Sequence, residues 1–270
     1  MRFALDHVVI AVADLERTIA DYRSLGFTVE PGGRHPGRTS HNALVVFEDG
    51  AYLELIAWTA PNPAERWNVE LAKHGEGLMD FALIPEDVPR AIEEAKSRGL
   101  ALSGPIEGGR VRPDGRKLEW RTGRQSTFDL PFLCGDITPR ELRVPTGGAR
   151  RHANGAIGAA RLVVAVHDLD ASLARYQALL GRAAEPPAPG KGASPGLRTA
   201  TLGLDGCALV LATPAGEPCS AFDAEVRQRL STRGDGPCAL ALQSVSGQSG
   251  TLDRISTHGA PIELVPRTDS

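Results

Sequence analysis

Apolar and polar residues follow one another in a pattern that this chain contains twice. Residues 5–12 form an apolar run rich in β-branched side chains, and residues 161–166 form a second run of the same kind. Such runs predict largely buried strands. An aspartate follows each run where a helix N-cap is expected, Asp14 in the first copy and Asp168 in the second. Apolar residues at helical spacing then predict helices over residues 15–25 and 169–180.

Each predicted helix leads into further strands and a tight turn. In the first copy strands are expected from residue 27, over 41–47 and over 51–58, with a polar loop at 31–38. Asp49-Gly50 supplies the hairpin turn of this β-α-β-β-β module. The second copy has a Pro/Gly-rich loop at 186–196, strands at 197–204 and 207–213, and the matching turn Asp205-Gly206.

Two weaker modules complete the pattern. The second module is predicted to contain a strand at 77–84, a helix from Val88 to Gly99, and extended segments near 102–111, 117–122 and 128–136. The fourth is predicted to contain a strand at 238–244, a helix over about 250–258 and a strand at 261–265. We therefore expect an α+β fold in which paired modules form cupped mixed sheets, duplicated and with a truncated last module.

The small, polar and basic segment 147–155 is typical of a linker between domains. The expected domains are residues 1–146, which hold the candidate site, and residues 156–270, a degenerate copy. A chain of 270 residues suits two domains that each bury a core. A hydrophobic content of 41% with 23% charged residues is ordinary for a soluble globular protein.

Charge and cysteine usage exclude several classes of partner and compartment. A net charge of −3 gives no electrostatic case for nucleic acid or an anionic membrane surface. No apolar run reaches the length of a membrane span, and the N-terminus lacks the apolar stretch of a signal peptide. The four cysteines show no CxxC spacing. We expect a cytoplasmic protein with free thiols and without nucleic-acid or membrane partners.

Several short segments together carry a resemblance to a known superfamily. They are Leu5-Asp6-His7-Val8-Val9-Ile10-Ala11-Val12 before an Asp-Leu helix start, Leu25-Gly26-Phe27 at the helix end, Tyr52-Leu53-Glu54-Leu55 and His35-Pro36-Gly37-Arg38-Thr39-Ser40-His41-Asn42-Ala43-Leu44. With these segments the chain resembles the vicinal oxygen chelate superfamily, which contains glyoxalases, bleomycin-resistance proteins and extradiol dioxygenases. The last segment is similar to its glyoxalase-like branch. The resemblance implies paired modules that form a cupped sheet around a metal or ligand site.

The resemblance also implies metal ligands on the first and last strands of paired modules. Carried over, these positions are His7 and Glu54, an imidazole and a carboxylate that suit a divalent Zn, Ni, Fe or Mn ion. Two other interpretations stay open. His7 can simply form a hydrogen bond in the core, and Glu54 can pair with an arginine such as Arg38 or Arg121 to orient a substrate.

The second module offers weaker candidates for the remaining ligands. Asp80 stands at the position that matches His7, where it can act as an oxygen ligand or merely cap or pair locally. If residues 132–133 align with residues 52–53, Cys134 matches Glu54. Cys134 is then either a ligand or a small buried apolar residue.

Other residues of the first half suggest a pocket for a small molecule. His41 is the candidate proton carrier, and Arg38 lies in a basic loop that can bind a carboxylate. Trp58, Trp120 and Phe132 are expected to line an apolar pocket, although aromatic residues in strands also form plain core. The loop can equally be a solvated surface.

The second copy lacks the polar pair. Arg161 and Val210 occupy the positions of His7 and Glu54, and neither an alkyl group nor a cation binds a metal. The site is therefore expected in the first half.

Three functions follow from the resemblance. The first is a metal-dependent lyase, isomerase or dioxygenase acting on a small oxygenated molecule, whose metal would act as a Lewis acid. The second is a metal-free protein that binds or sequesters a small molecule oriented by Glu54. In the third, the second half is a partner surface or homodimer surface that covers an unpaired sheet edge after Val265.

Overall fold

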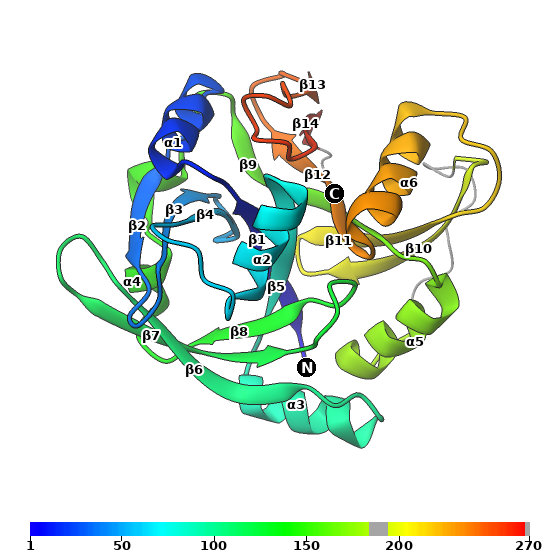
Figure 1. The fold of residues 1–270 in the computed structure, drawn as a ribbon, viewed down its shortest axis with the longest axis horizontal. Coiled ribbons are helices and arrows are strands. Elements are labelled where there is room, and N and C mark those ends of the chain that lie inside the picture. The colour runs from blue at the N-terminus through cyan, green and yellow to red at the C-terminus, as the bar shows by residue number, and fades with distance from the viewer. Residues whose placement is uncertain (184–193, 268–270) are drawn as a thin grey trace.

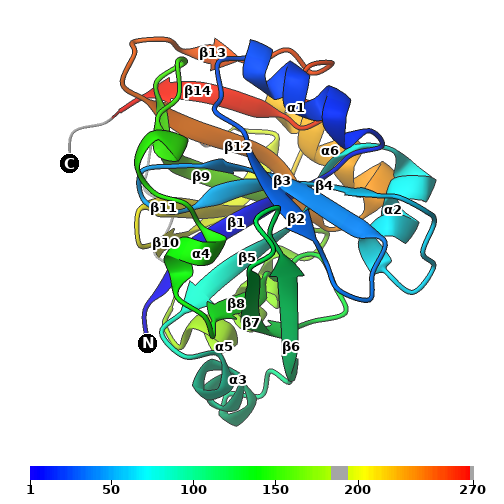
Figure 2. The ribbon, with the colours of Figure 1, turned by 90° about the vertical axis from the view of Figure 1, so that its left-hand side faces the viewer.

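The computed structural model describes residues 1–183 and 194–267, and the strands of its first half close into a barrel (Figures 1 and 2). These strands are β1 (Phe3–Ala11), β2 (Glu30–Arg34), β3 (Ser40–Val46), β4 (Tyr52–Trp58), β5 (Gly77–Pro85), β6 (Ser103–Val111), β7 (Lys117–Arg124) and β8 (Phe132–Asp136). Around the barrel the order is β1-β4-β3-β2-β6-β7-β8-β5. The predicted pairing of two modules is confirmed, and their sheet closes completely.

The second half forms an open sheet of six strands in the order β10-β11-β9-β12-β14-β13. Its strands are β9 (Ala156–Ala165), β10 (Leu197–Leu204), β11 (Cys207–Pro214), β12 (Gly236–Ser244), β13 (Gly250–Thr251) and β14 (Ile262–Pro266). The Pro/Gly-rich loop expected at 186–196 lies mostly outside the described residues. The mixture of strand directions and helices confirms the predicted α+β class.

Helices lie outside the sheets and cover them (Figure 1). They are α1 (Leu15–Ser24), α2 (Arg66–His74), α3 (Val88–Ser97), α4 (Arg140–Arg143), α5 (Leu169–Leu180) and α6 (Ala221–Arg233), with a short 3-10 turn at Gly147–Arg150. The predicted caps are present: Asp14 accepts from Arg17 N at the start of α1, and Asp168 accepts from Ala171 N at the start of α5. In the described part of the chain, no helix is long and apolar enough to cross a membrane.

The repeated tyrosines connect the two halves. The hydroxyl of Tyr22 on α1 donates to the carbonyl of Thr257, 3.3 Å away in the last module. The hydroxyl of Tyr176 on α5 donates to the carbonyl of Asp129, 2.5 Å away in the second module. Both rings are fully buried. The duplicated residue therefore makes the same kind of cross-half hydrogen bond in each copy, which fixes the second half against the barrel wall.

Two sequence predictions are corrected by the structure, and two helices were missed. The segment 31–38, expected to be a loop, begins as β2, because residues 30–34 pair with β3 through a bulge next to Pro31. The helix expected at 250–258 is absent from the described chain, where β13 and a series of turns occupy this segment. Helices α2 and α6 were not predicted, and they occupy equivalent places between the two modules of each half.

The barrel closes along a narrow seam between β2 and β6. Among the described residues, a single pair, Arg34 with Val111, joins these strands. Gly33 makes this approach possible, since a Cβ atom on it would lie 2.1 Å from the carbonyl oxygen of Val111, and its φ of 139° also favours glycine. The remaining neighbours around the barrel are paired at two or more positions.

Candidate functional site

The barrel encloses a cavity of about 310 Å³. Its walls come from β1, β3, β4, β6, β7 and β8, and further lining residues come from α2 and from the loop that follows β2. Because side chains alternate along a strand, β4 and β7 contribute every second residue, Tyr52, Glu54 and Ile56 from the first and Trp120, Thr122 and Arg124 from the second. A cavity of this size suits a small organic molecule at the lower limit of typical ligand pockets.

Two buried side chains face each other in the wall of the cavity. His7 lies on β1 and Glu54 on the neighbouring parallel strand β4, and His7 Nε2 is 3.6 Å from Glu54 Oε2. The ring of Tyr52 stacks on the His7 ring with centroids 4.6 Å apart, and Phe132 meets the same ring edge-on at 5.3 Å. These two rings hold the imidazole in one orientation.

Asp6 lies beside His7 because β1 is bulged. The pairing of β1 with β5 shifts between residues 5 and 7, so Asp6 as well as His7 turns inward. Asp6 Oδ2 lies 2.7 Å from His7 Nδ1, and Arg143 of α4 donates to both Asp6 oxygens. Burial alone raises the pKa of Asp6, but the charge of Arg143 and the contact with His7 outweigh it and hold that pKa well below its usual range.

The Asp6 carboxylate fixes the tautomer of His7. A carboxylate only accepts hydrogen bonds, so Nδ1 of His7 carries a hydrogen and donates it to Asp6. Nε2 is then the nitrogen that can gain or lose a proton, and it faces Glu54. An imidazole oriented by one buried carboxylate and next to another can carry a proton between them and a ligand.

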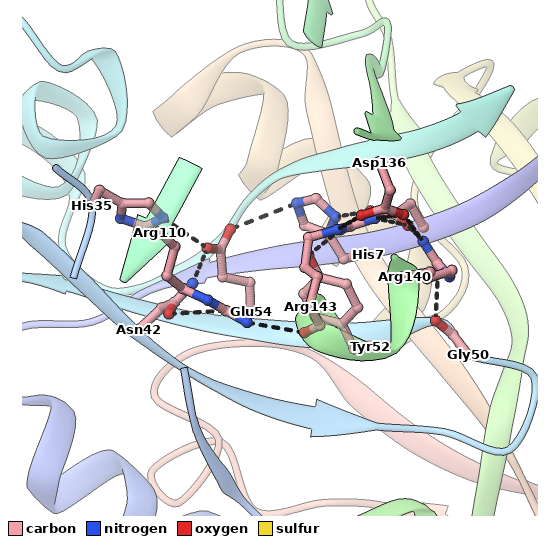
Figure 3. Close-up of polar contacts among 11 residues, drawn as sticks. His7, His35, Asn42, Gly50, Tyr52, Glu54, Arg110, Asp136, Arg140 and Arg143 are labelled. Carbon is pink, nitrogen blue, oxygen red and sulfur yellow. Dashed lines mark hydrogen bonds and ion pairs between the residues drawn. The ribbon is translucent and has the colours of Figure 1, made fainter. Parts of the chain in front are cut away.

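Polar neighbours position the Glu54 carboxylate on the side away from His7. Asn42 Nδ2 donates to Glu54 Oε1 at 2.5 Å, and His35 Nε2 lies 3.9 Å from the same oxygen. Arg110 Nη1 in turn donates to Asn42 Oδ1 at 3.3 Å, so Asn42 connects a cation to the carboxylate (Figure 3). Burial lowers the pKa of His35, although Glu54 opposes this, and His35 is therefore neutral at pH 7.

A resident divalent metal would need more donors than His7 and Glu54 supply. Structural and catalytic sites for zinc and related ions use three or four protein ligands. Within residues 1–183 and 194–267, no group of three or more histidine, cysteine, aspartate or glutamate side chains is arranged to hold a metal ion.

Asp80 does not complete the set. The spacing of the helix caps aligns β5 with β1 and makes Asp80 the counterpart of His7. Its carboxylate is occupied by other partners: Arg66 and Trp67 both donate to Oδ2, the indole at 2.9 Å, and Oδ1 accepts from Phe81 N. The prediction of Asp80 as a metal ligand is therefore corrected to a local ion pair.

The counterpart of Glu54 is an aromatic ring. Glu54 is paired with Val9, and the equivalent residue of β5, Ala82, is paired with Phe132. Phe132 thus takes the position that the sequence alignment gave to Cys134. Burial raises the pKa of the Cys134 thiol to about 12, which keeps it protonated. The donors present do not fit a divalent metal.

The remaining predicted residues have three different placements. Arg38, Trp120 and Phe132 line the cavity as expected. Trp58 only borders it, where its indole donates to Glu65 Oε2 at 2.8 Å. His41 is corrected: its neighbours Ser40 and Asn42 line the cavity, so strand alternation turns His41 to the outer face of the barrel.

Several cavity residues were missed by sequence reasoning. Arg110 on β6, Arg124 on β7 and Arg143 on α4 line the cavity, as do Arg66 and Trp67 on α2. Arg66 and Trp67 carry a signal in the sequence, since the Trp-x-x-x-Leu spacing before a glycine indicates a short amphipathic helix.

The described part of the second half lacks an acid–base pair at the positions that match His7 and Glu54. The counterpart of His7 is Arg161, which forms an ion pair with Glu263 at 2.7 Å, and the counterpart of Glu54 is Val210. A second cavity of about 290 Å³ lies here, with an apolar floor that includes Val163 and Phe222. The polar pair of the first copy is thus replaced by an ion pair and an alkyl side chain.

Comparisons with known proteins agree with this fold. A family model described as a glyoxalase-like domain matches residues 5–180. A hypothetical protein from Staphylococcus aureus superposes with a TM-score of 0.71 at 12% identity, covering 98% of this chain and 100% of that chain. A mutant 4-hydroxymandelate synthase from Streptomyces coelicolor superposes with a TM-score of 0.58 at 17% identity, covering 90% and 71% respectively. In a comparison with curated proteins, none matched.

Proposed function

Because this chain belongs to the glyoxalase-like domain family, we propose that it is a metal-independent isomerase of a small oxygenated molecule, with His7 and Glu54 as its acid–base pair. The observation that carries this function is the 3.6 Å approach of His7 Nε2 to Glu54 Oε2 in the cavity wall. The orientation of His7 by the ionised Asp6 supports it.

The proposed reaction moves one proton within a carbonyl compound. Glu54 takes a proton from the carbon next to the carbonyl, and the electron pair of that C–H bond forms an enolate. His7 Nε2 accepts the proton from Glu54, and the resulting imidazolium is stabilised by Asp6. Return of the proton to a different atom of the enolate gives an isomer, with atoms and charge balanced.

The Tyr52 hydroxyl is the candidate donor to the enolate oxygen. It accepts a hydrogen bond from Arg143 Nη1 at 2.7 Å, so its own hydrogen remains available to the ligand. Burial raises the pKa of Tyr52 well above its usual value, with Arg143 opposing this, and the hydroxyl therefore stays protonated. Hydrogen bonds to a developing oxyanion in a dry cavity are among the stronger contributions to catalysis.

Deuterium exchange tests the proposal with a panel of small carbonyl compounds. Hydroxyacetone, dihydroxyacetone, pyruvate and phenylpyruvate are incubated with the full chain in D₂O, and loss of the proton signal next to the carbonyl is followed by NMR. We expect the wild type to accelerate exchange of at least one compound. Glu54→Gln should slow that exchange on the order of 10²- to 10⁴-fold, the usual contribution of an acid or base.

The outer-face variant His41→Ala is the matched control and should exchange at the wild-type rate. Equal exchange in wild type and Glu54→Gln would overturn the assignment of Glu54. Wild-type exchange at the buffer rate with every compound would overturn the isomerase function.

The second candidate function is binding without catalysis. It is favoured by the hydrogen bond that Asn42 donates to Glu54. This bond orients the Glu54 carboxylate so that it can accept a hydrogen bond from a ligand. Saturable ligand binding in the absence of any proton exchange, lost in Glu54→Gln, would support this function instead.

A further inference from the structure

We propose that the barrel cavity selects small organic acids, whose carboxylate binds to Arg38, Arg110 and Arg124. The inference rests on the proposed function, because it names the substrate class of the same cavity. The residues of the cavity wall include arginines that have no acidic partner among the described residues.

Within the described chain, Arg110 is a buried cation without an acidic partner. Its side chain is 3% exposed, and its guanidinium donates only to neutral oxygens, Asn42 Oδ1 at 3.3 Å and the carbonyl of Arg143 at 2.9 Å. Its Nε is buried and has no hydrogen-bond partner among the described residues. Burial lowers the pKa of Arg110, and the nearby Tyr52 and Glu54 oppose this shift. An unsatisfied donor of this kind is costly unless a ligand completes it.

Arg124, which is partly buried, and Arg38, which is exposed, also line the cavity. Arg124 lies over the rings of Trp67 and Phe132, with its guanidinium carbon 5.3 and 5.0 Å from their centres. Burial lowers the pKa of Arg124, and the charges of Arg66 and Arg38 act in the same direction against Asp80. Within residues 1–183 and 194–267, neither Arg124 nor Arg38 has a carboxylate within ion-pair distance.

The other two arginines that line the cavity have acidic partners. Arg66 is paired with Asp80, and Arg143 is paired with Asp6 and Asp136. In the described part of the chain, the acids that line the cavity form no ion pair with the three remaining cations. Glu54 is bound by Asn42, Glu65 accepts from Trp58 and Asn62, and Glu107 is exposed.

A planar carboxylate suits these guanidinium groups because two parallel N–H donors can meet its two oxygens. The aromatic side chains of Trp67, Trp120 and Phe132 complete the wall with apolar surface for the rest of the ligand. The predicted ligand is therefore an acid with a short carbon skeleton and a second oxygen that reaches Tyr52 or Glu54.

The test compares acids with their neutral amides. Acetate, pyruvate, benzoate and phenylpyruvate are each titrated into the full chain beside the corresponding primary amide, at constant ionic strength and pH 7, with thermal shift and isothermal calorimetry as readouts. We expect at least one acid to bind at least tenfold more tightly than its amide. In Arg110→Gln and Arg124→Gln this ratio should fall to about one. Arg161→Gln, in the exposed ion pair of the second half, is the matched control.

Two arginine variants are used because Arg110 is fully buried and its replacement can impair folding. Arg124 is only partly buried, so Arg124→Gln tests the site with less risk to the fold. Equal affinity for acid and amide throughout the series, or an undiminished ratio in both arginine variants, would overturn the inference. Inorganic phosphate is titrated in parallel. Binding of phosphate with no preference for any carboxylic acid would also overturn it.

The two proposals fail separately. If the protein prefers acids over amides but exchanges no protons, the anion site is supported and the isomerase function is refuted. If it exchanges protons only of neutral ketones, the isomerase function is supported and the anion site is refuted. Glu54→Gln should keep the acid-over-amide ratio within about threefold, because Glu54 does not contact the carboxylate in this arrangement.

Discussion

Arg143 and Asp6 form a two-point ion pair inside the barrel, with Arg143 Nη1 and Nη2 lying 2.7 and 3.0 Å from the two Asp6 oxygens. Both side chains are almost completely buried. The pair joins the last helix of the first half to its first strand. It also keeps Asp6 ionised, and Asp6 sets the tautomer of His7.

Replacing Arg143 by leucine should destabilise the protein by about 3 kcal/mol, because the buried Asp6 loses its two-point partner and keeps only Arg140 and His7. Urea unfolding followed by circular dichroism measures this change. The control is Arg161→Leu, which removes an exposed ion pair with Glu263 and should cost about 1 kcal/mol or less. Adding Asp6→Asn to Arg143→Leu should recover part of the loss. A similar small cost for both single variants would contradict the structural role of the pair.

Asp6→Asn should change the tautomer of His7. Arg143 would bind the amide oxygen of the new side chain and turn its NH₂ group toward Nδ1, which leaves the hydrogen on Nε2. Nitrogen-15 NMR of the imidazole reports this change directly, and a purely structural role of Asp6 would not produce it. Proton exchange should fall on the order of 10²- to 10⁴-fold. A wild-type tautomer together with normal exchange would refute this role.

Treatment with a chelator should leave the protein unchanged. The donors around His7 and Glu54 do not form a metal site, so dialysis against EDTA should alter neither the melting temperature nor ligand affinity. Metal analysis of protein purified without chelators is the companion measurement. Stoichiometric metal that disappears in both His7→Ala and Glu54→Ala would instead restore the metal-dependent enzyme as the function.

Stability should decline as the pH falls below about 6.5, and His152 contributes to this decline. Its Nδ1 accepts from Thr28 N at 3.0 Å while Nε2 contacts the carbonyl of Val46 at 3.0 Å, so the ring is bound in its neutral form. Burial lowers the pKa of His152, although the contact with Val46 opposes this. The unfolded chain therefore binds more protons near pH 6, and unfolding free energy rises with pH through this range.

Urea unfolding between pH 5 and 7 measures this slope. His152→Phe keeps a ring between Phe27 and Phe47 and should make the slope shallower. The slope should not vanish, because burial lowers the pKa of His35 as well. An unchanged slope in His152→Phe would show that His152 does not titrate in this range.

Cysteine alkylation should be selective. Burial raises the pKa values of Cys134, Cys207 and Cys238 to about 12, and all three side chains are inaccessible. Cys219 is exposed. Iodoacetamide at pH 8 should therefore modify Cys219 in the folded protein, with the other three reacting only in urea, as read by peptide mass spectrometry. Rapid modification of Cys134 in the folded state would show that the barrel interior opens.

Much of the fold could be predicted from local pattern. Strand runs, aspartate caps and Asp-Gly turns are short-range signals, and they located the modules of both halves. Helices α2 and α6 were missed because they lie between modules, outside the repeat that guided the interpretation. Their signals were present: Ser220 caps α6, and Phe222, Val226 and Leu230 follow at intervals of one helical turn.

The candidate site could be predicted only in part. His7 and Glu54 were found because family resemblance and strand alternation both point to them. Asp6 was missed because a bulge, which no alternation rule reveals, turns it inward. Arg143 was missed because it reaches Asp6 from far along the chain, and such contacts depend on how the barrel closes. Asp80 matches His7 in the module repeat and was therefore expected to bind a metal, but it pairs locally with Arg66 instead.

The narrow seam between β2 and β6 has a consequence for how a ligand enters. A barrel hides its interior, so a molecule bound there must pass through an opening in the wall or at an end. Separating β2 from β6 breaks the pairing of Arg34 with Val111 and of no other described residues. Each other pair of neighbouring barrel strands is joined at two or more positions. The seam borders β6, which carries Arg110, and follows directly into the loop of His35 and Arg38. The least paired part of the described wall thus lies beside Arg110 and the loop that carries Arg38, and the strands can part there at the lowest cost in backbone pairing.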